Sequence, residues 1–188
     1  MEEGVPPGQA GMSAVVGLEL SELSRLCEEA SRVAPVTVAC VNAPRHTVVS
    51  GWRNGLDALA DLVEESGGAV VPLAIEIPCH SPLLAPVAMA FRSVLDGVVL
   101  RAPRIPVVNP VTGSFVEHPD DVSSSMTDQL TCPVDFERAL RTAAALGVRE
   151  LVQCGPGRAL LSYAKRIAVD PPFASSALED KLAGHVAA

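Results

Sequence analysis

The stretch Val36–Trp52, VTVACVNAPRHTVVSGW, holds two β-rich runs that are separated only by Ala43, Pro44 and Arg45. Valine, threonine and tryptophan are enriched in strands, and so short a connection is typical of a hairpin. The stretch therefore predicts two neighbouring antiparallel strands. The segments on either side decide what kind of sheet these strands belong to.

The flanking segments place a helix and a strand on each side of the hairpin. Before it, residues 11–18 predict a strand and residues 21–31 an amphipathic helix, with Ser21 as a candidate N-cap. After it, residues 54–68 predict a second amphipathic helix with glycines at its end, and residues 69–75 a last strand. The order βαββαβ is that of a split βαβ, ferredoxin-like unit.

Beyond residue 76 the pattern changes to helices that alternate with short, apolar strands. Helical periodicity covers residues 81–98, 134–147 and 156–167, and short buried strands are predicted at 104–110 and 148–155. Strand, glycine turn and helix make the unit of a parallel α/β layer, so the predicted fold class is α/β. With only two or three such strands, the layer is expected to be part of a larger sheet.

The composition excludes several kinds of partner. The formal net charge of −8 disfavours non-specific binding to nucleic acid and to anionic membranes. No segment has the apolar length of a membrane span, and the start MEEG is unlike a signal peptide. The five cysteines lack CxxC or zinc-type spacing. We interpret them as reduced, mostly buried thiols of a cytoplasmic protein without a metal site.

His80 is the first candidate for catalysis, because it follows the apolar run that begins at Ile75 and precedes a helical segment. A structural histidine is the alternative. Ser81 is better explained as the N-cap of the next helix, with Pro82 at its first position. Cys79 is a poor partner for His80, since adjacent strand residues point to opposite faces.

Four further residues are candidates for substrate binding. Gly155 and Gly157 lie in QCGPGRAL, a strand, turn and helix that could bind a phosphate, although the glycines could equally serve the turn alone. Asn42 and Asn109 each follow a predicted strand, where asparagine is often a turn former.

Six segments, taken in order, resemble a known family of acyltransferases: AVVGL, VNAPRHTVVSG, IPCHSPLLAPV, PVVNPVTG, DQLTCPVDFERAL and LVQCGPGRALLSYAKRI. The family comprises the malonyl-CoA:acyl-carrier-protein transacylases of fatty acid synthesis and the acyltransferase domains of polyketide synthases. The resemblance covers the chain from Met1 to about Ala177. It implies acyl transfer from coenzyme A, through a serine in G-H-S-x-G, to the phosphopantetheine thiol of an acyl carrier protein.

The resemblance also implies roles for single residues. His80 would be the general base for the serine, and the backbone carbonyl of Gln129 would orient the imidazole. Asn42, in N-x-P, would lie near the substrate channel. Arg45, Arg53, Arg158, Lys165 and Arg166 are candidates to meet coenzyme A or an acidic carrier protein, with solvated surface charge as the alternative. No cofactor is expected besides acyl-CoA and the carrier protein as substrates.

The family fold implies a division of the chain. A ferredoxin-like subdomain would cover residues 11–76, after a lead-in at 1–10. The C-terminal part of an α/β-hydrolase-like subdomain would cover residues 77–170, and a surface tail residues 171–188. The expected fold class is thus α/β, with an α+β subdomain followed by an incomplete parallel sheet.

The sequence departs from the family in lacking G-x-S-x-G, the oxyanion segment and the arginine that pairs with the malonyl carboxylate. Ser13, Ser50 and Ser162 are not on a predicted strand-to-helix elbow. We therefore expect the chain to be the C-terminal part of an acyltransferase, which carries the general base and is nearly inactive without an N-terminal half. The expected acyl group is malonyl. The alternatives are an inactive module that docks carrier protein, and a truncated fragment.

Overall fold

The structure, a computed structural model, describes residues 5–6 and 8–181 of the chain. Its largest sheet is mostly antiparallel and has the strand order β4-β1-β3-β2-β7. The first elements are β1 (Ala10–Val16), α1 (Leu20–Ala30), β2 (Val36–Ala43), β3 (His46–Trp52), α2 (Arg53–Glu65) and β4 (Ala69–Pro72). This is the predicted order βαββαβ, with a last strand that ends at Pro72 rather than Ile75.

The hairpin of β2 and β3 is the centre of this sheet. Arg45 occupies its turn with a φ of 56°, and the register runs from Ala43 opposite His46 to Val36 opposite Gly51. The predicted N-cap Ser21 is wrong, because α1 begins at Leu20 and its N-cap position is Glu19, which makes no side-chain capping bond.

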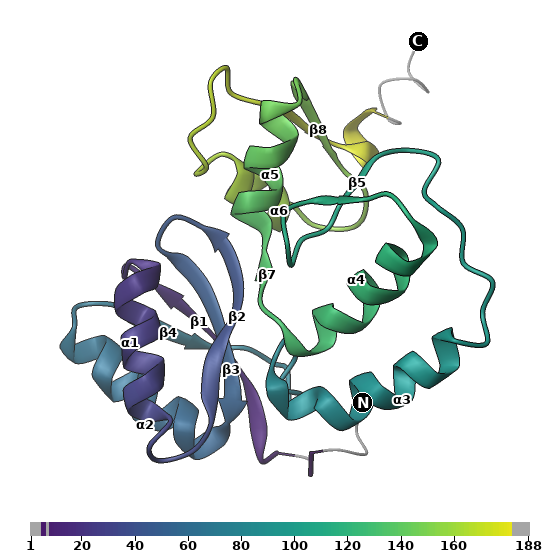
Figure 1. The fold of residues 1–188 in the computed structure, drawn as a ribbon. Coiled ribbons are helices and arrows are strands. Elements are labelled where there is room, and N and C mark those ends of the chain that lie inside the picture. The colour runs from purple at the N-terminus through teal and green to yellow at the C-terminus, as the bar shows by residue number, and fades with distance from the viewer. Residues whose placement is uncertain (1–4, 7, 182–188) are drawn as a thin grey trace.

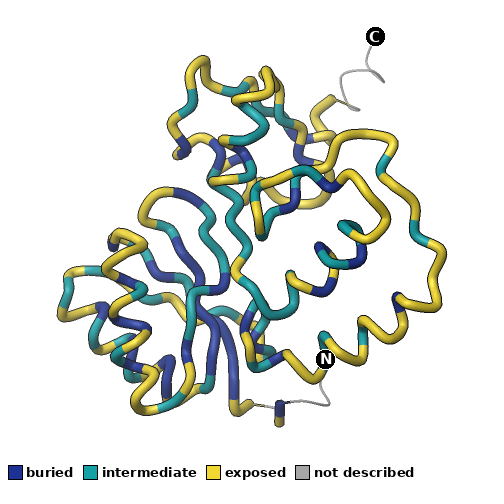
Figure 2. Tube along the Cα trace, viewed as in Figure 1, coloured by how far each residue is buried: buried dark blue, intermediate teal, exposed yellow. Residues whose placement is uncertain are grey.

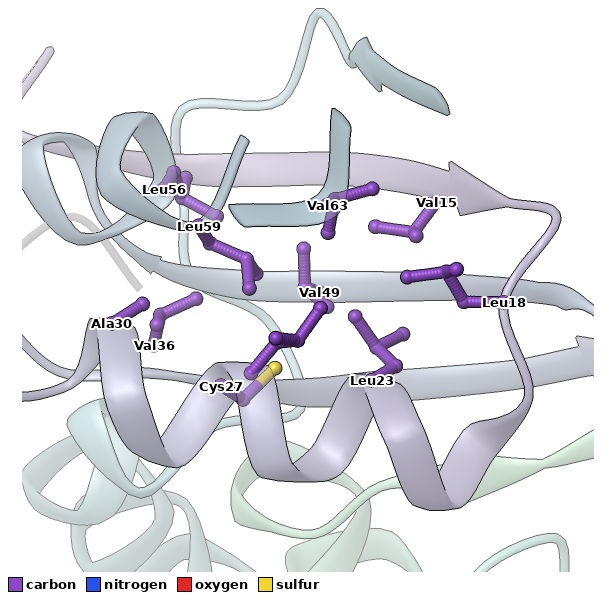
Figure 3. Close-up of a cluster of buried hydrophobic side chains, with 11 residues drawn as sticks. Val15, Leu18, Leu23, Cys27, Ala30, Val36, Val49, Leu56, Leu59 and Val63 are labelled. Carbon is purple, nitrogen blue, oxygen red and sulfur yellow. The ribbon is translucent and has the colours of Figure 1, made fainter. Parts of the chain in front are cut away.

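The main hydrophobic core lies between this sheet and the two helices that cover one face of it, as Figure 3 shows. Leu23 and Leu59 project from α1 and α2 toward Val49 of β3, and all three side chains are fully buried. The helical period of three to four residues and the strand period of two bring these apolar residues to a common interior. The opposite face of the sheet has a smaller core, made by Met12, Ala39 and Val48.

The rest of the chain contains shorter elements (Figure 1). They are η2 (Pro82–Leu84), α3 (Ala85–Leu95), β5 (Val107–Val108), β6 (Phe115–Val116), α4 (Pro119–Thr131), β7 (Val134–Asp135), α5 (Phe136–Ala145), β8 (Glu150–Gln153), α6 (Ala159–Ala164) and β9 (Ala174–Ala177). The three helices predicted for this part of the chain are present as α3, α5 and α6, and each is shorter than the range that the sequence predicted.

The strands of this second region do not form one parallel layer. Among the residues that the structure describes, β5 pairs only with β6, antiparallel, and β8 only with β9, in parallel. The predicted buried strand at 104–110 is wrong in extent and burial: it has two residues, and Val107 is exposed. Residues 174–177, within the predicted surface tail, form β9, and Ala177 is buried there.

One short strand connects the two regions. β7 adds to the edge of the larger sheet in parallel with β2, with Val134 opposite Cys40 and Asp135 opposite Val41. A second core, built on Ala43, Leu140, Ala164 and Ile167, packs α5 and α6 against the end of β2. Figure 2 shows that α3 and the connector to β5 are mostly exposed. None of the helices in the described part of the chain has the length and apolarity to cross a bilayer.

Candidate active site

His80 lies in a turn between β4 and η2, not at the end of a strand as the sequence suggested. Its φ is 58°, in the left-handed region that residues other than glycine adopt uncommonly. On the N-terminal side, the Cys79 amide donates to the Ile77 carbonyl at 2.9 Å. The chain therefore folds tightly back just before the imidazole.

Ser81 fixes the chain on the other side of His80. Its side chain is buried, and its Oγ accepts a hydrogen bond from the Leu83 amide at 3.2 Å. This confirms Ser81 as the N-cap of η2 and Pro82 as the first helical residue. The Ser81 amide donates to the Leu130 carbonyl of α4 at 3.2 Å. A cap and a bond to a distant helix thus hold the residue after His80.

The imidazole itself contacts the same helix. His80 Nδ1 is within hydrogen-bond distance of the backbone carbonyl of Gln129, so the structure brings together the two residues that the resemblance paired. A carbonyl oxygen can only accept, so Nδ1 carries the proton and Nε2 keeps its lone pair. Gln129 is in the last turn of α4, whose dipole presents its negative end to the ring.

Cys79 and Cys40 lie on the far side of this turn, against the smaller core of the sheet. Burial, together with a smaller effect of the neighbouring Cys79, raises the pKa of Cys40 to about 11. Burial also raises the pKa of Cys79. Both groups are therefore neutral thiols near pH 7, and Cys79 does not supply a thiolate to His80. All five cysteines are free, but Cys27 alone is buried, Cys40, Cys79 and Cys132 are half-buried and Cys154 is exposed, so the prediction that most of them are buried is wrong.

Asn42 lies at an irregularity of β2. The register between β2 and β3 shifts between Val41 and Ala43, so Asn42 is the extra residue of a bulge. Val41, its neighbour, pairs with β7, which follows α4 after two residues. Asn42 thus follows the residue of β2 that pairs with β7, and β7 is the strand that comes after the helix of Gln129. Its role in binding substrate stays a prediction.

Asn109 forms a turn, the alternative that the sequence left open. Its side chain is buried, and its Oδ1 accepts hydrogen bonds from the amides of Val111 at 2.8 Å and Thr112 at 3.2 Å. Its backbone bonds to Ser114 and Gly113, at 2.7 Å each, close the loop between β5 and β6. With Oδ1 committed to the turn, the structure supports a structural role rather than substrate binding.

Gly155 and Gly157 lie in the exposed loop between β8 and α6, with φ of 129° and 80°. The buried Gln153 organises this loop, because its Nε2 donates to the Gly157 carbonyl at 2.9 Å and its Oε1 accepts from the Leu161 amide at 3.3 Å. Within residues 8–181, none of this loop's hydrogen bonds reaches His80. The helix that follows has only six residues, which favours the turn-forming role of the glycines over phosphate binding.

Three of the five cationic candidates contact other groups of the chain. Arg45 pairs with Glu19 at 2.6 Å and Arg158 with Asp180 at 2.7 Å, both between exposed side chains. Arg53 donates from Nε to the Gly8 carbonyl at 3.5 Å. These contacts are those of surface charges, which contribute little to stability or to a specific site.

None of the three serines considered from the sequence lies on a turn between a strand and a helix, as the nucleophile elbow requires. Ser13 and Ser50 are buried within β1 and β3, and Ser162 is in α6. In the described residues, no serine hydroxyl is bonded to His80, and no three His, Cys, Asp or Glu side chains gather as metal ligands would. The sequence did not reveal that the Ser81 amide binds α4, or that Pro133 follows this helix directly after Cys132. Both residues lie in motifs of the family resemblance.

Known proteins resemble this chain in sequence and in fold. The acyl transferase domain family matches residues 5–170. The malonyl CoA-acyl carrier protein transacylase of Escherichia coli (strain K12) is 31% identical over 177 residues, which are 94% of this chain and 57% of the relative.

Two solved structures have the same fold over the matched part. The acyl-carrier-protein S-malonyltransferase of Burkholderia pseudomallei 1710b has a TM-score of 0.88 and 33% identity, over 93% of this chain and 57% of that one. A malonyl-transacylase in complex with a type II polyketide synthase acyl carrier protein has a TM-score of 0.87 and 29% identity, over 94% and 56%. The chain thus spans little more than half the length of these relatives. Through the match of residues 5–170, it belongs to the acyl transferase domain family.

Proposed function

We propose that this chain is the base-carrying part of an acyl-CoA:acyl-carrier-protein acyltransferase, with a malonyl group as the acyl substrate. The observation that carries the proposal is the contact of His80 Nδ1 with the Gln129 carbonyl at the end of α4. The names of the relatives support malonyl and acyl carrier protein as substrates. The nucleophile is a serine outside the residues of this sequence.

The chemistry follows from the orientation of the ring. The serine hydroxyl attacks the thioester carbonyl of acyl-CoA while His80 Nε2 takes its proton, and the same nitrogen then protonates the departing coenzyme A thiolate. In the second half, the carrier-protein thiol loses its proton to Nε2 and attacks the acyl-serine. The serine leaves as an alkoxide and regains that proton. The Gln129 carbonyl keeps Nδ1 protonated throughout, in place of a carboxylate.

Exposed apolar side chains support a further segment that completes the fold. Val99 is 87% exposed and Ile105 77%, and both lie in the connector between α3 and β5. β5 and β8 each pair with one other strand, so each has an open edge. Apolar residues and unpaired strand edges are normally covered. We infer that the segment with the serine covers them, either in the same polypeptide or as a separate chain.

The two regions of the fold have separate roles in this proposal. We infer that residues 11–76 are a ferredoxin-like subdomain, supported by the strand order β4-β1-β3-β2 with two helices on one face. Residues 77–170 are the C-terminal part of an α/β-hydrolase-like subdomain, completed by strands from the missing segment. Five unpaired cysteines support a reducing, cytoplasmic location.

The test is acyl transfer by the native protein. The protein is isolated from its source, every co-eluting polypeptide is identified by mass spectrometry, and malonyl transfer from malonyl-CoA to holo acyl carrier protein is measured. We expect the native material to be active and the 188-residue chain alone to be nearly inactive. His80→Ala in the native protein should lower the rate by about 10³-fold or more. The matched control is His118→Asn. His118 is exposed, and the asparagine that replaces it can still act as the N-cap of α4.

The outcome separates the enzyme from its main alternative, a carrier-protein docking module without activity. If the native material binds carrier protein but transfers nothing, and His80→Ala changes nothing, the docking module is correct. If the 188-residue chain alone turns over malonyl-CoA at rates typical of enzymes, an external serine is excluded.

A further inference from the structure

We propose that Pro133 is a positioning residue for His80, because it leaves the Gln129 carbonyl without a helical donor and so available to the imidazole. The inference deepens the proposed function and rests on it for the role of His80 as base. It concerns a residue that touches neither substrate nor imidazole. Its effect is on the hydrogen bonds of the last turn of α4.

The last carbonyls of α4 show where the helix stops supplying donors. In an α-helix, the carbonyl of residue i accepts from the amide of residue i+4. The Asp128 carbonyl accepts in this way from the Cys132 amide at 2.8 Å. For Gln129 the corresponding residue is Pro133, which has no N–H. The next carbonyl, of Leu130, accepts from the Ser81 amide at 3.2 Å. The turn that carries His80 thus takes two successive carbonyls of α4.

Pro133 also determines the backbone just before it. A residue that precedes proline is disfavoured in the helical region, and Cys132 has φ −113° and ψ 150°, which is extended. The helix therefore ends at Thr131, and the chain enters β7 beside β2 after two intervening residues. Pro133 itself is exposed. Its side chain buries little surface, so its influence acts mainly through the backbone.

The consequence for the ring is a single tautomer. An alanine at 133 would bring an N–H that competes for the Gln129 carbonyl and would relax Cys132 toward the helical region. His80 Nδ1–H would then lose part of its acceptor. Because the net effect of one such hydrogen bond is modest, we expect the ratio of Nδ1–H to Nε2–H tautomer to fall about fivefold.

The experiment measures this ratio directly. Long-range ¹H–¹⁵N NMR spectra of the ¹⁵N-histidine-labelled 188-residue chain report the tautomer of each ring, and a His80→Gln variant assigns the signals. We expect His80 to be predominantly the Nδ1–H form in the parent chain. Pro133→Ala should show the fivefold fall in the tautomer ratio. Pro133→Gly should show a smaller fall, because glycine supplies the N–H but disfavours the lengthening of α4 beyond Thr131.

The controls keep the outcome decisive. Pro106→Ala changes an exposed proline far along the sequence from α4 and should leave the His80 tautomer ratio unchanged. Circular dichroism identifies a variant that fails to fold, in which case the other position-133 variant decides. A ratio equal to that of the parent in every folded position-133 variant overturns the inference. Since the readout requires no acyl transfer, this failure is distinct from failure of the proposed activity.

Discussion

At the scale of single residues, His80 combines a left-handed backbone with a side-chain contact to the Gln129 carbonyl. A left-handed backbone costs an ordinary residue about 1–2 kcal/mol, so the φ of 58° must be held by neighbouring contacts. Here the Cys79 amide, the Ser81 amide and the Ser81 cap provide these contacts. Contacts on both sides therefore hold the backbone of His80, and the Gln129 carbonyl contacts its imidazole.

The cysteines differ enough in environment to give a prediction about reactivity. Burial, together with a smaller effect of Glu28, raises the pKa of Cys27 to about 12, while the pKa of Cys40 is raised to about 11. At pH 8 their thiolate fractions are therefore very small, whereas Cys154 is exposed. We expect iodoacetamide to alkylate Cys154 first and Cys27 last, as measured by peptide mass spectrometry over time.

The urea-denatured chain is the control for this labelling, and all five cysteines should react there at similar rates. Labelling of native Cys27 or Cys40 as fast as Cys154 would contradict the raised pKa values.

The sequence predicts some of these residue roles and not others, for a physical reason. Ser81 could be assigned as a cap because Ser-Pro before a helical run is a local signal. The contact of His80 with Gln129 spans 49 positions of sequence, so no local pattern reveals it. Only the resemblance to a family did. Asn109 could not be decided in advance, because a turn former and a ligand look alike in sequence.

At the scale of elements, the start of α4 gives a pH prediction. Asp121 Oδ2 accepts hydrogen bonds from the amides of His118 at 2.8 Å and Glu117 at 3.0 Å, and these bonds lower the pKa of the carboxyl. A carboxyl whose pKa is lower in the folded state stabilises the protein above its unfolded pKa, and this contribution is lost as the pH falls. The loss should begin below about pH 5 and continue below the ordinary value of 3.8.

Asp121→Asn should therefore lower the melting temperature at pH 7 and flatten its decline between about pH 5 and pH 3. Asp120→Asn, one residue earlier in the same first turn, is the matched variant and should keep the parent's decline. Thermal melts across this pH range provide the measurement. Equal slopes for the two variants would show that the Asp121 carboxylate contributes nothing to folding.

The elements were predictable where polar and apolar residues alternate with a clear period. Residues 10–72 have such periods, and their order was predicted in full. The run at 104–110 is apolar without a period, and such runs do not distinguish a buried strand from a connector. β9 was missed because its sequence, ASSA, has small residues and no strand signal.

At the scale of the whole molecule, the exposed apolar side chains of α3 and its connector predict self-association. Met89, Val94, Val99 and Ile105 are all well exposed. Burying apolar surface gains about 25 cal/mol per Å², so isolated chains should associate through these residues as concentration rises. We expect the double variant Val99→Gln, Ile105→Gln to stay monomeric at higher concentration without a loss of melting temperature.

Size-exclusion chromatography with light scattering measures this association. Val33→Gln is the matched control, since Val33 is 61% exposed but lies at the end of α1, away from the connector. It should not change the association. A parent chain that stays monomeric at every concentration would show that the exposed residues need no cover.

The pairing of β7 with β2 has a consequence for how such a site can vary. Only four residues separate Gln129 from the first position of β7, and that position is registered against Cys40. Substitutions at this sheet edge can therefore displace the acceptor of the imidazole without altering any group that meets a substrate. With His80 as the proposed base, mutations in this strand would change the rate of acyl transfer while leaving unchanged the groups that recognise the acyl chain.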